Sequence, residues 1–259
     1  MSRETVTDIL CIGAQRAMTS WLHQVLTAHP GVAPFANFDP VTSTNKEAHY
    51  WDWNHRRGAD WYRTLMRPLK DDVKSLDFTP EYAFLDEGQI AECKALSPGA
   101  RVIYLLRDPL ARAVSAIRMR TVWASNNAPA DAVTLSLDHD FLERCRNAAL
   151  HSHGAYAANL RRWRARYPDI LVLNIEAVQA DPMAALTRIF DHCALPAPDA
   201  ETAERLGQRA ANHIWVTPKY RLNADCLHFL HGLTWLEREA IAAEGFTFTE
   251  GAALLDSAS

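Results

Sequence analysis

The 259-residue sequence lacks several features that would assign its class at once. It has no run of about 18 apolar residues, so we expect no transmembrane helix. Its start, MSRETVTDIL, has no signal-peptide core, so we expect a cytoplasmic protein. It has little excess of one charge: the formal net charge of −4 provides no global field to attract nucleic acid or a membrane surface. Any anionic ligand must therefore be held by a local cluster of positive charge.

Paired cysteines are also missing. The five cysteines are odd in number, scattered, and never in C-x-x-C spacing. The 11 histidines show no metal-ligand spacing with them. We therefore expect reduced, mostly buried thiols and no metal site.

Short apolar runs alternate with helical stripes along the chain. Strands are predicted at 8–14, 74–80, 100–109 and 169–178. Helices are predicted from Thr19 to the HPG at 29–31, at 86–97, after Pro109, at 156–167 and at 183–193. Residues 31–63 are predicted to be a long functional loop with short helical pieces, and the part from about 199 to be helical with a polar loop at 212–226. The alternation predicts one domain over 1–259, with a three-layer α/β fold in which helices flank a central parallel sheet.

The loop after the first strand, CIGAQRAMTSW, resembles a phosphate-binding (P-loop-like) turn. A glycine turn leads into a helix that opens with two hydroxyls, Thr19 and Ser20. Backbone N–H groups and the helix dipole favour an anion there, and Arg16 adds charge. The loop lacks the Gly-Lys-Ser/Thr ending of a nucleotide triphosphatase. The alternative is a plain strand–helix turn with a threonine N-cap.

A second loop follows the strand at 100–109. Asp108 and Pro109 are predicted to be the N-cap and first residue of a helix, and Arg107 is expected to project from the same sheet edge as the first loop. The alternative for Arg107 is a pair with Asp108 or a surface salt bridge. Together the two loops predict a clamp for a ligand that carries phosphates at both ends.

These segments resemble the sulfotransferases that use 3′-phosphoadenosine 5′-phosphosulfate (PAPS). IGAQRAMTSWLHQVLTAHP resembles their 5′-phosphosulfate loop, and RVIYLLRDPLARAVSAI their 3′-phosphate segment. NKEAHYWD, RRGADWY and DFTPEY resemble the heparan-sulfate branch in the same order, and GAYAANLRRWRARYP and ILVLNIEAVQADPMAALTRIFDHCAL continue the match. The resemblance covers roughly residues 8 to 195. Each motif is loose, but five in order make a specific signal.

The resemblance implies a cofactor site for PAPS and its product PAP, without a metal. The first loop would supply Gly13, Gln15, Arg16, Ala17, Met18, Thr19 and Ser20. Arg107 and Ser115 would bind the 3′-phosphate, and TPKYRL would give Lys219, Tyr220 and Arg221 in the C-terminal part that covers the site. Three departures stand out: Arg16 replaces a lysine, Met18 replaces a glycine, and TPKYRL lacks the family's glycine.

The resemblance also implies a catalytic segment, NKEAHYW. Glu47 would take the acceptor proton, with a pKa raised toward working pH by partial desolvation, and Lys46 would orient the sulfuryl oxygens. His49 is the competing base, and we favour Glu47. Nearby aromatic residues would either line an acceptor pocket or pack the loop on the sheet: Trp51, Trp53, Trp61 and Tyr62.

The expected reaction is sulfuryl transfer to a hydroxyl or amine of a carbohydrate or small metabolite. Two alternatives are a nucleotide or small-molecule kinase with an atypical loop and a non-catalytic PAPS-binding protein. The sequence does not indicate an oligomeric state.

Overall fold

The computed structural model describes residues 4–35, 45–68, 70, 72–124, 133–211 and 220–256. Its centre is a five-stranded sheet in the order β2-β3-β1-β4-β6, in which every neighbouring pair is parallel. The strands are β1 (Ile9–Cys11), β2 (Val32–Ala33), β3 (Lys74–Asp77), β4 (Arg101–Leu106) and β6 (Leu171–Asn174). Because β1 lies between β3 and β4, the loops that follow these three strands meet at one edge of the sheet.

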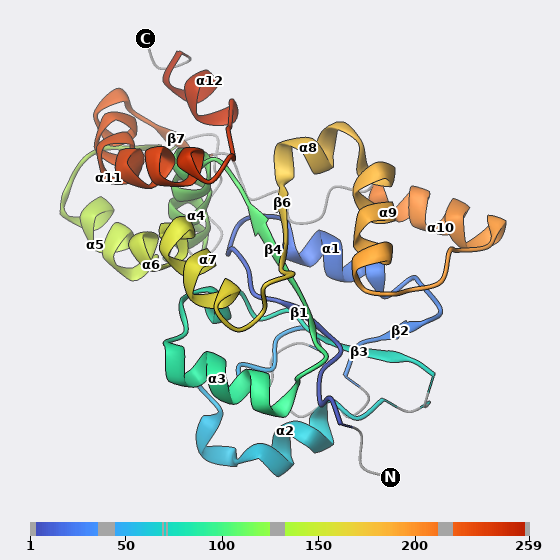
Figure 1. The fold of residues 1–259 in the computed structure, drawn as a ribbon. Helices are drawn as coiled ribbons and strands as arrows, with labels where there is room; N and C mark the ends of the chain where they lie inside the picture. The colour runs from blue at the N-terminus through green and yellow to red at the C-terminus, as the bar shows by residue number, and fades with distance from the viewer. Residues whose placement is uncertain are drawn as a thin grey trace.

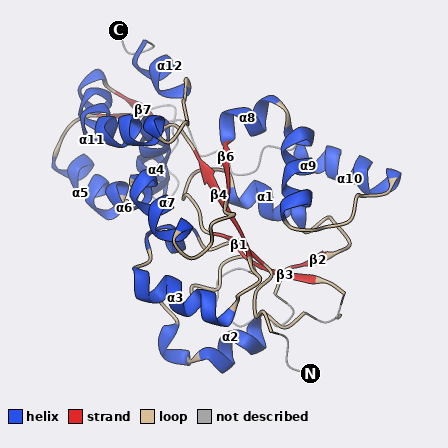
Figure 2. Cartoon of the chain, in the orientation of Figure 1, coloured by secondary structure: helices blue, strands red, loops and turns tan. Residues whose placement is uncertain are grey.

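Helices cover both faces of this sheet, as Figures 1 and 2 show. One layer contains α1 (Thr19–Leu26), α8 (Ile175–Ala180), α9 (Pro182–His192) and α10 (Ala200–Ala210). The other contains α3 (Glu87–Leu96), α4 (Pro109–Ala124), α7 (Tyr156–Arg164) and α11 (Ala224–Ala243). This arrangement confirms the predicted three-layer α/β fold.

Smaller elements complete the described chain. The remaining helices are α2 (Ala59–Leu65), α5 (His139–Asn147), α6 (Leu150–Gly154) and α12 (Glu250–Asp256), with 3-10 turns η1 (His55–Arg57) and η2 (Pro80–Phe84). β5 (Thr134–Leu135) and β7 (Arg221–Leu222) form a separate parallel pair. Among the helices of the described ranges, none is both long and apolar enough to span a bilayer.

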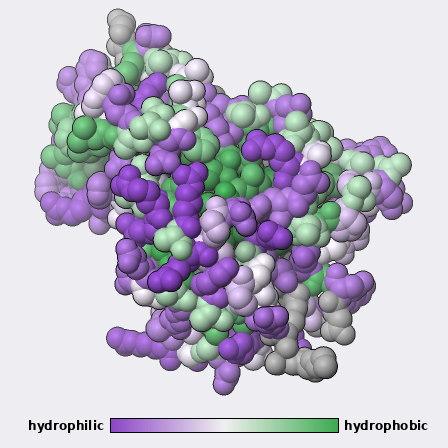
Figure 3. Space-filling view, in the orientation of Figure 1, coloured by the Kyte–Doolittle hydropathy of each residue, from purple (hydrophilic) through white to green (hydrophobic). Residues whose placement is uncertain are grey.

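In Figure 3 hydrophilic residues cover most of the visible face, and hydrophobic ones gather near its centre, where Figure 1 draws β4 and β6.

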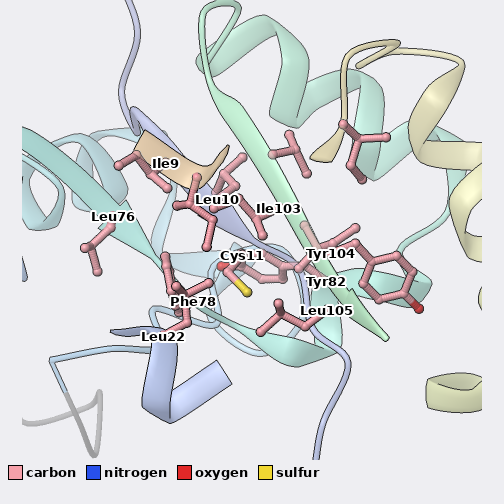
Figure 4. Packing of buried hydrophobic residues seen from close by; sticks show 14 of the residues in the cluster. Ile9, Leu10, Cys11, Leu22, Leu76, Phe78, Tyr82, Ile103, Tyr104 and Leu105 are labelled. Carbon is pink, nitrogen blue, oxygen red and sulfur yellow. The ribbon is translucent and has the colours of Figure 1, made fainter. Parts of the chain in front are cut away.

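The core forms on both faces of the central strands. All three residues of β1 are buried, and in β4 every residue after Arg101 is buried, as expected for a parallel sheet covered on two sides. Figure 4 shows Leu22 of α1, Phe78 and Tyr82 packed around Cys11. The strands that carry the site loops are thus fixed by the core.

Sequence predictions of element bounds were wrong at several places. The strand predicted over 169–178 ends at Asn174, because the Asn174 side chain accepts a hydrogen bond from the Glu176 amide (2.9 Å) and thereby caps α8. The loop predicted over 31–63 contains β2, whose two residues are too few to show a period.

Candidate functional site

The loop after β1 is held against the end of β4. The Leu105 amide donates to the Gly13 carbonyl, and the Ala14 amide donates to the Leu105 carbonyl, both at 2.8 Å. Gly13 has φ +126°, and a Cβ at this position would lie 2.9 Å from the Pro80 carbonyl oxygen. A side chain is therefore excluded at Gly13 on both conformational and steric grounds.

The loop then turns into α1 through two left-handed residues, Arg16 (φ 71°) and Met18 (φ 65°). Met18 is the N-cap of α1, which excludes the alternative of a threonine N-cap. A non-glycine residue in this conformation costs about 1–2 kcal/mol, so the position has the backbone that glycine provides at lower cost. Beside it, Ala17 and Thr19 are buried and Ser20 is half-buried at the start of the helix.

The side chain of Arg16 joins this loop to the segment after β4. Its Nε donates to the Ser115 hydroxyl at 3.0 Å, and Arg107 Nη1 donates to the Arg16 carbonyl at 3.3 Å. Burial, and then the nearby charge of Arg107, lower the pKa of Arg16 to about 10, so it is a cation at neutral pH. The structure thus brings together three residues predicted from two separate motifs.

Arg118 adds a further positive charge that the sequence analysis missed. It lies on α4, where its Nε donates to the Tyr220 carbonyl at 2.9 Å. Burial and the charge of Arg107 lower the pKa of Arg118, while Glu250 opposes this shift. Arg118 lies three residues after Ser115 on the same helix, and this spacing, which places it beside a predicted site residue, is the signal that could have identified it.

Arg107 pairs with an unexpected partner, Glu250 of α12. Its Nε donates to Glu250 Oε2 at 2.9 Å, and its Nη2 contacts Glu250 Oε1. Of the two alternatives predicted for Arg107, the pair with Asp108 is wrong, because Asp108 Oδ1 accepts from the Ala111 amide as the cap of α4 and its Oδ2 faces Arg238 at 3.3 Å. The partly exposed ion pair with Glu250 corresponds to the other alternative, a surface salt bridge.

The site also contains residues 46–49, which lie beside the end of β3. The Phe78 amide donates to the Lys46 carbonyl at 2.8 Å. Lys46 Nζ contacts both the Thr19 hydroxyl (3.2 Å) and Glu47 Oε1 (2.5 Å). Lys46 therefore links the start of α1 to the predicted base.

Neighbouring charged groups shift the pKa values of Glu47 and His49 in opposite directions. Burial alone would raise the pKa of Glu47, but hydrogen bonding to His49 and the charge of Lys46 outweigh it and lower this pKa to about 2. Burial alone would lower the pKa of His49, but its contacts with Asp52 (2.7 Å) and Glu47 (3.4 Å) raise it to about 10. The pKa of Glu47 is thus shifted in the opposite direction to the one expected, and the raised pKa of His49 favours Glu47 over His49 as the base.

A buried carboxylate, Asp77, anchors this segment, and the sequence analysis missed it. Asp77 ends β3 and accepts hydrogen bonds from the Ala48 amide (3.1 Å) and from the hydroxyls of Thr79 (2.6 Å), Tyr62 (3.0 Å) and Tyr82 (3.0 Å). Burial raises the pKa of Asp77 to about 6 despite these bonds. Its signal was the aspartate in DFTPEY, at the carboxyl end of a predicted strand.

Gln15 connects the loop to the same network. Its amide donates to Glu81 Oε1 at 3.4 Å, and Glu81 Oε2 lies 3.9 Å from His49. Ligand atoms of His49, Asp52 and Glu81 lie within 4.8 Å of one another, which is compatible with a metal ion and was not expected from the sequence.

The remaining predicted residues come from the C-terminal part and from the aromatic segment after His49. Lys219 lies outside the described residues. Tyr220 is 1% exposed and packs in the core beside α4, and Arg221 is exposed on β7. Trp51 and Tyr62 are buried and pack the loop on the sheet, whereas Trp53 is 70% exposed and stacks on His49 with 3.6 Å between ring centroids.

The chain is similar to known proteins of one family. The model of the family described as "Sulfotransferase family" matches residues 47–199, more than half of the chain. The mouse (Mus musculus) heparan sulfate glucosamine 3-O-sulfotransferase 3B1 is 27% identical over 189 residues, which are 72% of this chain and 45% of that protein. The bovine (Bos taurus) bifunctional heparan sulfate N-deacetylase/N-sulfotransferase 2 is 26% identical over 205 residues, 71% of this chain and 22% of that protein. The chain thus spans less than half the length of both relatives.

Solved structures share the fold. A sulfotransferase from Alicyclobacillus acidocaldarius superposes with a TM-score of 0.65 at 17% identity, covering 96% of this chain and 98% of that one. A sulfotransferase from Mycobacterium avium gives 0.58 at 16% identity, covering 95% and 78%. The match of the family model over residues 47–199 shows that the chain belongs to the sulfotransferase family.

Proposed function

We propose that this chain is a PAPS-dependent sulfotransferase that acts on a hydroxyl or amine of a carbohydrate or small-metabolite acceptor. One observation carries the proposal: the loop after β1 contacts a cationic 3′-phosphate segment through Arg16 and a lysine–glutamate pair through Thr19. A binding loop for one end of PAPS, a binding segment for the other end and a candidate base are therefore contiguous.

The residues present fit PAPS. Arg16, Arg107 and Arg118 are close enough for the charge of Arg107 to lower the pKa of the other two, so an anion there would relieve their repulsion. Arg107 and Ser115 would hold the 3′-phosphate. The start of α1, with Thr19 and Ser20, would hold the 5′-phosphosulfate.

When bound, PAPS supplies the sulfuryl group, whose sulfur bonds to the acceptor as its bond to the 5′-phosphate oxygen breaks and the electron pair leaves with PAP. Glu47, which is a carboxylate at neutral pH, accepts the acceptor proton, and its lowered pKa makes it a weaker base than the sequence analysis expected. Lys46, which contacts Thr19 and Glu47, stabilises negative charge between the loop and the base. His49, as a cation held by Asp52, orients Glu47.

Two observations support a carbohydrate acceptor: the names of the relatives and the exposed indole ring of Trp53. Both relatives carry heparan sulfate in their names, which favours a carbohydrate. Trp53 presents an exposed indole beside the base network, and indole faces stack well on sugar rings. The kinase alternative is not favoured, because the loop lacks the Gly-Lys-Ser/Thr ending. The cytoplasmic location stays a prediction.

Calorimetric titration with PAP, without added metal, tests the proposal. We expect micromolar PAP binding, much weaker ATP binding, and loss of PAP binding in Arg107→Ala. Arg164→Ala is the matched control, because Arg164 forms an ion pair with Glu244 (2.8 Å) away from the cluster. The proposal fails if PAP does not bind, or if ATP binds more tightly than PAP.

A screen with PAPS then identifies the acceptor. PAP release is measured with amino-sugar oligosaccharides, neutral oligosaccharides and small alcohols. Release that depends on an acceptor and is lost in Glu47→Gln supports transfer. Tight PAP binding without release on any acceptor would favour the non-catalytic alternative.

A further inference from the structure

We propose that the carboxylate of Glu250 occupies the position of the cofactor's 3′-phosphate, so that PAP or PAPS must displace it from Arg107 to bind. Glu250 is then an affinity-determining residue of the cofactor site. This inference rests on the proposed function, because it takes Arg107 as the ligand of the 3′-phosphate.

The geometry of the pair is that of an anion bound by a guanidinium fork. Two nitrogens of Arg107, Nε and Nη2, contact the two carboxylate oxygens of Glu250. Arginine binds carboxylates and phosphates through the same two-pronged arrangement. A phosphate therefore cannot take this side of the Arg107 fork while Glu250 is on it.

Charge explains why a carboxylate is found there. Arg107 lies near two other arginines, Arg16 and Arg118, and its charge lowers the pKa of both. Glu250 acts on Arg118 in the opposite direction, so the carboxylate offsets part of this repulsion in the cofactor-free protein. A 3′-phosphate carries more negative charge and more acceptor oxygens than one carboxylate, so it can replace Glu250 with a net gain.

The side chain of Glu250 can leave without unseating its helix. The start of α12 is fixed by other contacts: Glu176 accepts from the backbone amides of Thr249 and Glu250 at 2.9–3.0 Å. Asn174 donates to the Thr247 carbonyl at 2.8 Å, which ties the same segment to the end of β6. The Glu250 side chain is 33% exposed, so it has solvent to rotate into.

A functional consequence follows for the product. PAPS and PAP both carry the 3′-phosphate, so competition from Glu250 weakens both and speeds the release of PAP, a step that limits turnover in many enzymes. A nucleotide without a 3′-phosphate has no need to displace Glu250, so its affinity is independent of this residue.

The experiment compares PAP and AMP binding by calorimetry in the wild type and in Glu250→Gln. We expect the PAP dissociation constant to fall about three- to tenfold in Glu250→Gln, as for loss of a competing ion pair, and the AMP constant to stay within about twofold. Glu244→Gln is the matched control, because it removes an ion pair with Arg164 that lies outside the cluster, and it should change neither constant. Thermal unfolding of each variant checks that the fold is kept.

The outcomes separate this inference from the proposed function. Equal PAP affinity in wild type and Glu250→Gln, with weaker binding in Arg107→Ala, overturns the inference and leaves the proposed function standing. Weaker PAP binding in Glu250→Gln also overturns it, since Glu250 would then support the site. Equal tightening of PAP and AMP would refute competition for the 3′-phosphate. No PAP binding in any variant refutes the proposed function together with the inference.

Discussion

The substitution Glu47→Gln tests the charge arrangement at the proposed base. Glutamine keeps the size of the side chain but cannot be ionised, so Lys46 and His49 lose the carboxylate that lies between them. The change should therefore affect both folding stability and turnover. It should leave PAP affinity within about twofold, because the expected cofactor contacts come from other side chains.

The size of the stability effect follows from the pKa of Glu47. A fall from the ordinary value of 4.5 to about 2 corresponds to about 3 kcal/mol, at about 1.36 kcal/mol per pKa unit. Because the pKa is lowered in the folded state, this stabilisation is present above pH 4.5 and is lost as the pH falls toward 2. The wild type should thus exceed Glu47→Gln by up to about 3 kcal/mol in the free energy of unfolding at pH 7, with the difference shrinking below pH 4.5.

Urea denaturation at a series of pH values measures this difference. Glu92→Gln is the matched control, since Glu92 pairs with His55 (2.8 Å) on the exposed surface and should contribute at most about 1 kcal/mol. Turnover, followed as PAP release, should fall by about 10²- to 10⁴-fold in Glu47→Gln. A variant with wild-type turnover would refute the role of Glu47 as the base. A stability difference that is absent at pH 7 or grows toward acid pH would refute the charge arrangement.

Three further predictions follow from the same contacts. The substitution Gly13→Ala should lower the free energy of unfolding by about 2 kcal/mol or more, because its Cβ would lie 2.9 Å from the Pro80 carbonyl oxygen in a backbone with φ +126°. A urea denaturation curve equal to that of the wild type would contradict this. The imidazole of His49, with its pKa of about 10, should stay protonated from pH 6 to 9 in NMR spectra of labelled histidine, and its stabilising effect should be full below pH 6.5 and vanish as the pH rises through 10. A His49 titration near its ordinary value of 6.5 would show that Asp52 and Glu47 do not hold the proton. The substitution Asp77→Ala should lower the free energy of unfolding by about 3 kcal/mol or more, because it leaves buried donors such as the Tyr62 hydroxyl without an acceptor. A decrease below about 1 kcal/mol in thermal unfolding would refute the anchoring role of Asp77.

Much of the fold was predictable because its central strands, β1 and β4, are buried on both faces. An apolar run such as 100–109, with amphipathic helices predicted on either side, indicates a buried parallel strand, and β4 lies within that run. The bounds were less predictable where a single polar contact decides them. Asn174 ends β6 by capping α8, and the apolar residues after it, Ile175 and Val178, look alike in a strand or in a buried helix.

In the site, too, the positions of residues were predictable from the topology, whereas their side-chain partners were not. Arg16 and Arg107 each follow a strand of a parallel sheet, so the sequence analysis could expect them at the same sheet edge, and the structure shows that their strands are neighbours. The partner of Arg107 was not, because Glu250 is 143 residues away and belongs to a helix whose docking depends on tertiary contacts. The direction of the pKa shift of Glu47 was predicted wrongly for a related reason. Sequence shows that such a carboxylate becomes buried, but whether burial or nearby cations control its pKa depends on distances, and here a lysine at 2.5 Å and a protonated imidazole at 3.4 Å outweigh desolvation. In both halves of the site, then, the sequence identifies the charged groups, and the packing of the rest of the chain decides which counter-charge each one meets.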